Sequence, residues 1–249
     1  MTPSGNTILI TGGGSGIGRA LAQRWHDRGN RVIVAGRRAD ALAETIAGRD
    51  GMASYVVDVD DVAALAKFAT QVVAEHPELN VLVNNAGIMR AEDATARRDL
   101  AGAEATVATN ILGPIRMTDA LIDHLSARPN AAIVNVTSGL AFVPLPAAPT
   151  YSATKAFIHS YTMSLRELLR GRVEVIELAP PGVQTDLTPG QATRPGYQPL
   201  DEFADEVVAL FEQQPAPEEI LVENVRHLRF AERDETLAEK LAMLAAYRP

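Results

Sequence analysis

Cysteine is absent from this chain of 249 residues. Its absence excludes disulfide bonds, thiol nucleophiles and zinc sites with cysteine ligands, and it fits a cytoplasmic protein. The five histidines are scattered without close metal-ligand spacing, so we expect no metal site.

Long apolar runs and basic clusters are missing as well. No stretch reaches ~18 uninterrupted apolar residues, and the apolar run at 7–10 is too short for a signal-peptide core. We therefore expect no membrane-spanning segment. The net charge of −8 argues against nucleic acid or an anionic membrane as the main partner.

Short β-branched runs alternate with longer helical patterns along the chain. The apolar runs lack clean alternation, which is typical of parallel strands covered on both faces. Repeated strand–helix–strand units predict right-handed crossovers. The strand-like runs are 7–10, 31–35, 54–57, 81–83, 132–136, 173–178 and 219–222, and the helix-like segments are 17–28, 39–47, 61–76, 97–125, 151–170 and 201–213. The sequence thus predicts the α/β class: one domain over 1–249 with a doubly wound Rossmann fold, a seven-stranded, mainly parallel sheet and helices on both faces.

The C-terminal third has two parts. Residues 180–200 are rich in proline and glycine, and long loops of this kind are often functional lids, so we expect a substrate-binding loop there. We expect 201–249 to supply a helix, the last strand and a terminal helix at 235–246.

A glycine-rich loop, Thr-Gly-Gly-Gly-Ser-Gly-Ile-Gly at 11–18, connects the first strand to a helix. Glycines let the backbone approach a phosphate without a Cβ clash, and a helix N-terminus supplies free N–H donors. The run fits Thr-Gly-x-x-x-Gly-x-Gly and contains no Gly-Lys-Ser/Thr of a nucleoside-triphosphate loop. A structural turn is the alternative; the placement between strand and helix favours dinucleotide binding.

Tyr151 and Lys155 are predicted to lie one turn apart on one face of a helix. The chain has three lysines, and no other tyrosine is followed by lysine at this spacing. A cation within about 4–6 Å lowers the pKa of a phenol by roughly 1–3 units, so we expect a lowered pKa and general acid–base chemistry at Tyr151. An ordinary amphipathic helix is the alternative for the pair alone.

With these elements in order, the chain resembles the short-chain dehydrogenase/reductase family. The resemblance rests on the glycine-rich loop, on Asn84-Asn85-Ala86-Gly87 after the fourth strand, and on the set Asn110, Ser138, Tyr151 and Lys155. It implies that this set is catalytic. Tyr151 would be the acid or base and Lys155 would lower its pKa and bind the ribose. Ser138 would hold the substrate oxygen, and Asn110 would hold a water for proton relay.

The resemblance also implies a set of cofactor-binding positions: Gly12, Gly14, Ser15, Gly16, Ile17, Gly18, Arg37, Arg38, Asp58, Val59, Asn85, Ala86, Gly87, Tyr151, Lys155, Pro181, Val183 and Thr185. NAD-preferring members carry an acid at the end of the second strand. Here Gly36 stands there, followed by two arginines that match a phosphate. Ser15 counts mildly against NADP, because many NADP-preferring relatives have a basic residue there. We expect NADP(H), with NAD(H) as the alternative.

Two departures from the family pattern bear on the loop and on assembly. Pro180-Pro181 replaces the usual Pro-Gly, which removes one N–H donor. The last strand lacks a glycine-rich ending that is common in tetrameric members. The helices at 97–125 and 151–170 have apolar residues on more than one face, and in relatives these helices pair across a two-fold axis. The resemblance therefore implies a homodimer, with a tetramer as the alternative.

The segment 139–149, GLAFVPLPAAP, is almost wholly apolar and precedes Tyr151. An apolar wall favours an uncharged substrate. The resemblance implies hydride transfer between NADP(H) and a carbonyl or alcohol, and with this wall we expect reduction of an uncharged, rather apolar ketone to a chiral alcohol. The alternatives are reduction or epimerisation at C=C or C=N, and a non-catalytic dinucleotide sensor. The intact set with Tyr151 speaks against the sensor, which has no need of an acid.

Overall fold

The computed structural model describes residues 1–246, and this part of the chain forms a seven-stranded sheet in the order β3-β2-β1-β4-β5-β6-β7. Within it every strand pairing is parallel. The strands are β1 (Thr7–Thr11), β2 (Arg31–Gly36), β3 (Ala53–Val56), β4 (Val81–Asn84), β5 (Ala132–Val136), β6 (Glu174–Leu178) and β7 (Glu219–Ile220). The predicted doubly wound α/β fold is confirmed.

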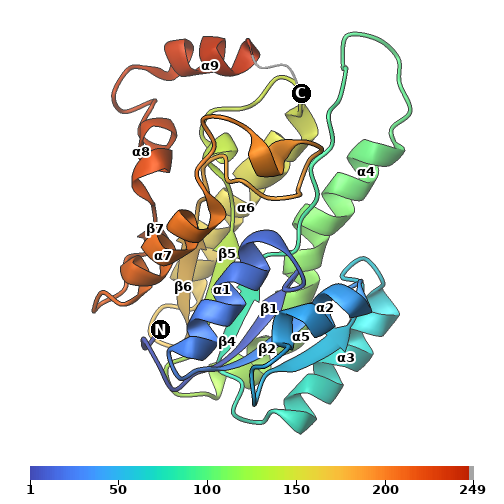
Figure 1. Cartoon of the computed structure of the whole chain (residues 1–249), viewed down its shortest axis with the longest axis vertical. Coiled ribbons are helices and arrows are strands. Elements are labelled where there is room, and N and C mark those ends of the chain that lie inside the picture. The colour runs from blue at the N-terminus through green and yellow to red at the C-terminus, as the bar shows by residue number, and fades with distance from the viewer. Residues whose placement is uncertain (247–249) are drawn as a thin grey trace.

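Helices cover both faces of the sheet (Figure 1). They are α1 (Gly16–Asp27), α2 (Ala39–Ile46), α3 (Val62–Glu75), α4 (Ala101–Val107), α5 (Gly113–Ser126), α6 (Pro149–Leu168), α7 (Leu200–Phe211), α8 (Glu223–Arg229) and α9 (Leu237–Ala245). None of the helices in residues 1–246 has the length and apolar character needed to cross a bilayer.

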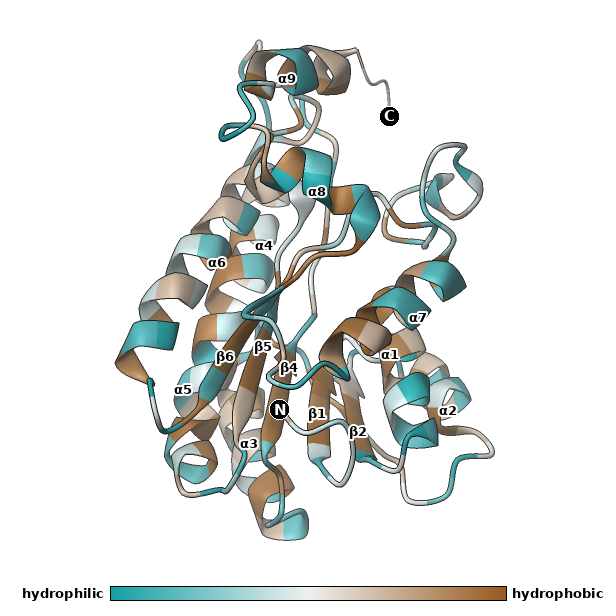
Figure 2. Cartoon of the chain, turned by 90° about the vertical axis from the view of Figure 1, so that its left-hand side faces the viewer, coloured by the Kyte–Doolittle hydropathy of each residue, from teal (hydrophilic) through white to brown (hydrophobic). Residues whose placement is uncertain are grey.

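Successive apolar residues of β1, β2, β4 and β5 enter two different apolar cores. Ile8 and Ile10 of β1 pack under α1 and α7, whereas Leu9 between them packs under α3, α5 and α6. These central strands are therefore mostly apolar, as the brown of β1, β4 and β5 in Figure 2 shows. Each fully buried side chain of this size stabilises the fold by ~1.5–3 kcal/mol.

The strand order reverses between β1 and β4. From β1 the chain winds to β2 and β3 on one side, and β4 to β7 extend on the other. In open parallel sheets the crevice beyond the carboxyl ends of the strands at such a reversal is the usual ligand site. The glycine-rich loop after β1 and the segment 85–87 after β4 both lie at this point.

Some elements differ from the sequence-based prediction. The helix predicted over 97–125 begins at Ala101 and consists of α4, a π-helical turn at Ala108–Leu112, and α5. The strand predicted over 219–222 ends at Ile220, and α8 follows it in a region where no helix is predicted. The last three positions of the predicted 201–249 segment lie outside the described residues.

Candidate active site

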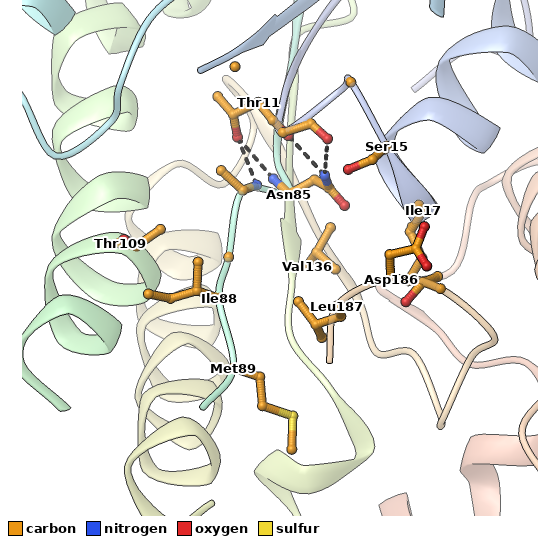
Figure 3. Close-up of a pocket in the computed structure, with 18 of the residues that line it drawn as sticks. Thr11, Ser15, Ile17, Asn85, Ile88, Met89, Thr109, Val136, Asp186 and Leu187 are labelled. Atoms are coloured by element: carbon orange, nitrogen blue, oxygen red, sulfur yellow. Dashed lines mark hydrogen bonds between the residues drawn. The ribbon is translucent and has the colours of Figure 1, made fainter. Parts of the chain in front are cut away.

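Thr11 and Asn85 join the carboxyl ends of β1 and β4. Thr11 Oγ1 accepts hydrogen bonds from the backbone N–H groups of Asn85 and Ala86, both at 3.1 Å. Asn85 Nδ2 donates to the carbonyl oxygens of Thr11 and Gly12 at 2.9 and 3.2 Å. Figure 3 shows Thr11 and Asn85 facing each other, with Ser15 to one side and Ile88 to the other. These bonds fix the glycine-rich loop against β4.

Two glycines of the loop have no room for a side chain. Gly12 has a φ of +68°, and a Cβ there would lie 2.9 Å from the Cα of Ala86. A Cβ on Gly18 would lie 2.4 Å from the carbonyl oxygen of Gly12. Only glycine lets α1 begin this close to the loop. Ser15 precedes α1 without a side-chain capping bond, so its first turn can offer N–H groups to an anion.

A cavity of about 630 Å³ opens at this edge of the sheet. Every predicted cofactor-binding position, from Gly12 in the loop to Thr185 after β6, lines it. Arg37 and Arg38 stand on its rim, where Arg38 Nη2 donates to Ser15 Oγ at 2.9 Å and the Arg37 side chain is 60% exposed. A backbone cradle without Cβ atoms, a helix N-terminus and two cations fit a phosphorylated dinucleotide.

Tyr151 and Lys155 face this cavity from the first two turns of α6, which starts at Pro149. Proline suits that first position because its missing N–H would have no partner within the helix. Lys155 Nζ donates to the carbonyl oxygen of Val136 at 2.8 Å and lies 5.6 Å from the centre of the Tyr151 ring. The predicted pair is therefore brought together, one turn apart and buried.

The pKa of Tyr151 moves in the opposite direction from the one that the spacing predicts. Burial raises the pKa of Tyr151 to about 12, although a hydrogen bond with Ser138 acts to lower it. Burial also lowers the pKa of Lys155 to about 8. Desolvation disfavours the charged form of both groups, and for Tyr151 it outweighs the hydrogen bond with Ser138.

Ser138 lies directly before the 3-10 turn that follows β5, and Asn110 lies between α4 and α5. Ser138 lines the cavity, and its Oγ accepts from the N–H of Leu140 at 3.1 Å, which caps a short 3-10 turn. Asn110 is 1% exposed and lies in the π-helical turn. Its side-chain amide binds the N–H and carbonyl groups of Ile88, each at 2.9 Å, and Thr154 Oγ1 at 3.1 Å. Asn110 thus holds the segment after β4 against α6.

A second cavity, of about 300 Å³, adjoins the first and shares Ser138 and Tyr151 with it. We call it the apolar chamber. Its apolar lining includes Met89, Leu140, Leu145, Leu187, Leu228, Met243 and Leu244, and its polar lining includes Tyr197, Asn224 and His227. None of the described residues that line it is Lys, Arg, Asp or Glu.

The lining of the apolar chamber is only partly foreseen by the sequence. Leu140 comes from the predicted wall at 139–149, and Tyr197 comes from the predicted loop at 180–200. His227 of α8 and Leu244 of α9 are not predicted, because no local pattern signals that these helices fold back over the site. Gln191 is also missed; its Nε2 donates to the carbonyl of Val183 at 2.8 Å and orders the loop after β6.

His159 takes part in a charged cluster behind the site. His159 Nδ1 lies 2.8 Å from Glu177 Oε2, and Thr137 donates to the other oxygen of Glu177 at 2.7 Å. Glu219, close to both, accepts two hydrogen bonds from Arg229 at 2.7 and 2.8 Å. The cluster is a set of mutually paired groups, which gives His159 a packing role between α6 and β6.

Comparison with known proteins gives one consistent family. The family model described as short chain dehydrogenase matches residues 6–195. The uncharacterized oxidoreductase DltE of Bacillus subtilis is 40% identical over 239 residues, which cover 94% of each chain. Sulfoacetaldehyde reductase 2 of Chromohalobacter salexigens is 36% identical over 186 residues, or 73% of this chain and 74% of that one.

A solved structure agrees over nearly the whole length. The short chain dehydrogenase from Burkholderia cenocepacia, crystallised in complex with NADP, superposes with a TM-score of 0.83 at 26% identity and covers 97% of this chain and 99% of that one. The family motifs, the sheet order and these matches lead to one conclusion: the chain belongs to the short-chain dehydrogenase/reductase family and has the fold of its oxidoreductases.

Proposed function

We propose that the protein transfers a hydride from NADPH to an uncharged, rather apolar ketone and so forms a chiral alcohol. The observation that carries this proposal is that Ser138 and Tyr151 line both the dinucleotide-sized cavity and the apolar chamber. A substrate carbonyl held in the apolar chamber beside Ser138 and Tyr151 would lie next to a proton donor and next to the cofactor cavity.

NADP(H) is the cofactor that the rim of the first cavity favours. Gly36 ends β2 without a carboxylate, so nothing at that position would repel a 2′-phosphate. Arg37 and Arg38 follow on the rim, where a guanidinium matches phosphate geometry. The related Burkholderia enzyme was crystallised with NADP, which supports the same choice.

In this proposal each residue of the site has a separate role. When bound, NADPH supplies the hydride. Tyr151 gives its phenolic proton to the carbonyl oxygen, and a pKa of about 12 keeps that proton in place until the transfer. Ser138 donates to the same oxygen and orients it. Lys155 binds the ribose hydroxyls, and Asn110 fixes the backbone at Ile88, along which the cofactor cavity runs.

The apolar chamber is the basis for the substrate class. A carboxylate or sulfonate in it would lose its hydration without gaining a lysine or arginine partner from the described lining. Sulfoacetaldehyde reductase 2, named for an anionic substrate, is a relative from which this chain would then differ in specificity. We further propose that residues 180–200 act as the loop that covers the substrate, since Leu187, Gln191 and Tyr197 line the chamber.

A matched pair of ketones tests the substrate class. We expect kcat/KM with NADPH to be at least about 100-fold higher for ethyl 3-oxobutanoate than for 3-oxobutanoate, because an unpaired buried charge costs several kcal/mol. The two compounds share the reacting ketone and differ in charge. Leu244→Lys should lower the ratio of kcat/KM for the ester to kcat/KM for the acid, whereas Leu244→Met should preserve this ratio. Leu244 lies on α9, a helix without fully buried residues, so the fold should tolerate both changes. Equal use of ester and acid by the wild type would contradict the proposed class.

The pH dependence follows from Lys155. Since kcat/KM for NADPH reports the groups of the free enzyme, it should be constant below the Lys155 pKa of about 8 and fall above it as the ammonium is lost. The limiting slope is about tenfold per pH unit. Tyr151, with a pKa of about 12, stays protonated across this range. Lys155→Met should lower kcat/KM at every pH and remove the inflection; an inflection that survives this change belongs to another group.

We also propose that the protein forms a homodimer and is cytoplasmic. Phe157, Met163 and Leu168 of α6 and Val107 of α4 are exposed apolar side chains, which supports the expected homodimer. A cytoplasmic location is expected from the absence of cysteine.

A further inference from the structure

Glu92 lies in the loop between β4 and α4, outside every motif described above, yet its side chain is only 7% exposed. Its Oε1 accepts from the backbone N–H of Thr150 at 3.1 Å, and its Oε2 accepts from Thr150 Oγ1 at 2.8 Å. Arg98 donates to the same carboxylate at 2.7 Å. The backbone N–H of Glu92 also donates to the carbonyl of Ala147 at 2.9 Å. One residue thus holds both the start of α6 and the loop before it.

The start of α6 lacks a cap of its own. Ala148 occupies the N-cap position and has no side-chain acceptor, and Pro149 follows it. The N–H of Thr150 is therefore the first free donor of the helix, and Glu92 accepts it from 58 positions away in the sequence. A carboxylate at this end also interacts favourably with the helix dipole. Arg98 balances the charge, so that no unpaired anion lies next to Tyr151.

Tyr151 directly follows Thr150 in this first turn, where helices fray most easily. The segment from Ile88 to Glu92 is also held at its other end, because the Asn110 side chain binds both the N–H and the carbonyl group of Ile88. The segment from Ile88 to Glu92 therefore ties the cofactor cavity to the turn that carries Tyr151.

We propose that Glu92 is a positioning residue: it caps α6 through Thr150 and so fixes the Tyr151 hydroxyl relative to Ser138 and Lys155. This inference rests on the role proposed above for Tyr151. Glu92 touches neither cavity, so it acts only through the placement of the first turn.

The test compares Glu92→Ala, which removes both acceptor oxygens, with Asp93→Ala. Asp93 is the neighbouring carboxylate, but it is exposed and its side chain accepts from Thr95, not from α6. Both changes remove one negative charge near Arg98. Glu92→Ala should speed amide hydrogen exchange in peptides covering 150–152 by at least about fivefold, and Asp93→Ala should leave it unchanged. This measurement needs neither substrate nor cofactor.

Turnover of ethyl 3-oxobutanoate gives the second measurement. Glu92→Ala should lower kcat about 5- to 30-fold, the factor that loss of one cap represents, with the Kd for NADPH within about twofold of wild type. In a Tyr151→Phe background the same change should alter the residual rate by less than about twofold, because the hydroxyl being positioned is already gone. Thr150→Val should reproduce part of the loss.

Several results would overturn the proposal. The first is that Glu92→Ala matches Asp93→Ala in exchange and in kcat. The second is that it lowers the residual rate of Tyr151→Phe as much as it lowers that of the wild type. Either outcome means that Glu92 does not act through Tyr151. Wild-type turnover in Tyr151→Phe itself would instead refute the proposed function, and the exchange comparison would still show whether Glu92 holds the turn.

Discussion

Tyr151→Phe should lower kcat for reduction of ethyl 3-oxobutanoate by about 10²–10⁴-fold, the usual contribution of a general acid. The ring remains, so the apolar contacts with Leu145 and Ala148 and the fold should survive. The proton donor that Ser138 contacts is lost. Affinity for NADPH should stay within about threefold of wild type, because the phosphate-binding loop is remote from the change. Steady-state kinetics and a fluorescence titration of NADPH measure the two quantities.

Tyr197→Phe is the matched control for this variant. Tyr197 lines the same chamber, and burial likewise raises its pKa, but it comes from the loop after β6 and does not line the first cavity, where Lys155 lies. We expect it to retain kcat within about fivefold. Should Tyr151→Phe turn over as fast as Tyr197→Phe, the acid is another group and the mechanism is wrong, even though the fold and family stand.

The second large effect concerns cofactor choice. Arg37→Ala should weaken NADPH binding by about 10- to 100-fold, in line with the loss of a hydrogen bond to a charged group, and should leave NADH binding nearly unchanged. Gly36→Asp adds an acceptor for a ribose hydroxyl and repels a 2′-phosphate. A Cβ at position 36 would lie 3.7 Å from Leu42 Cδ2, an ordinary contact, so the substitution fits. The double variant should prefer NADH.

NADH serves as the internal control for both variants, and Arg37→Lys keeps the charge while removing the planar fork. Dissociation constants for NADPH and NADH, measured on the same preparations, give the preference directly. If Arg37→Ala and Gly36→Asp both keep the wild-type ratio of the two constants, the 2′-phosphate is bound elsewhere.

The fold was predictable because its signals are local. Runs such as 132–136 are short, β-branched and apolar on both faces, which only a covered parallel strand satisfies. The glycines at 12 and 18 are recognisable from the local loop motif. The structure shows why a side chain is excluded there, since a Cβ on Gly12 would contact Ala86 and a Cβ on Gly18 would contact Gly12. Tyr151 and Lys155 share a helix face by spacing alone.

Features set by tertiary contacts were not predictable. Helix α8 has only seven residues, and its buried Val225 and Leu228 give too short a pattern to separate it from the end of a strand. The direction of the Tyr151 pKa shift depends on burial, which the spacing of Tyr151 and Lys155 does not report. The cap supplied by Glu92 joins residues 58 positions apart, so no sequence window contains it.

Deuteride transfer tests the central claim most directly. The enzyme is incubated with ethyl 3-oxobutanoate and NADPH labelled with deuterium at either face of nicotinamide C4, and the product alcohol is examined by mass spectrometry and NMR. We expect one of the two labelled cofactors to deliver deuterium to the carbinol carbon of a single alcohol enantiomer, and Tyr151→Phe to form the same product far more slowly. Oxidation of NADPH without deuterium on that carbon, or no alcohol from either cofactor, would contradict hydride transfer to a ketone.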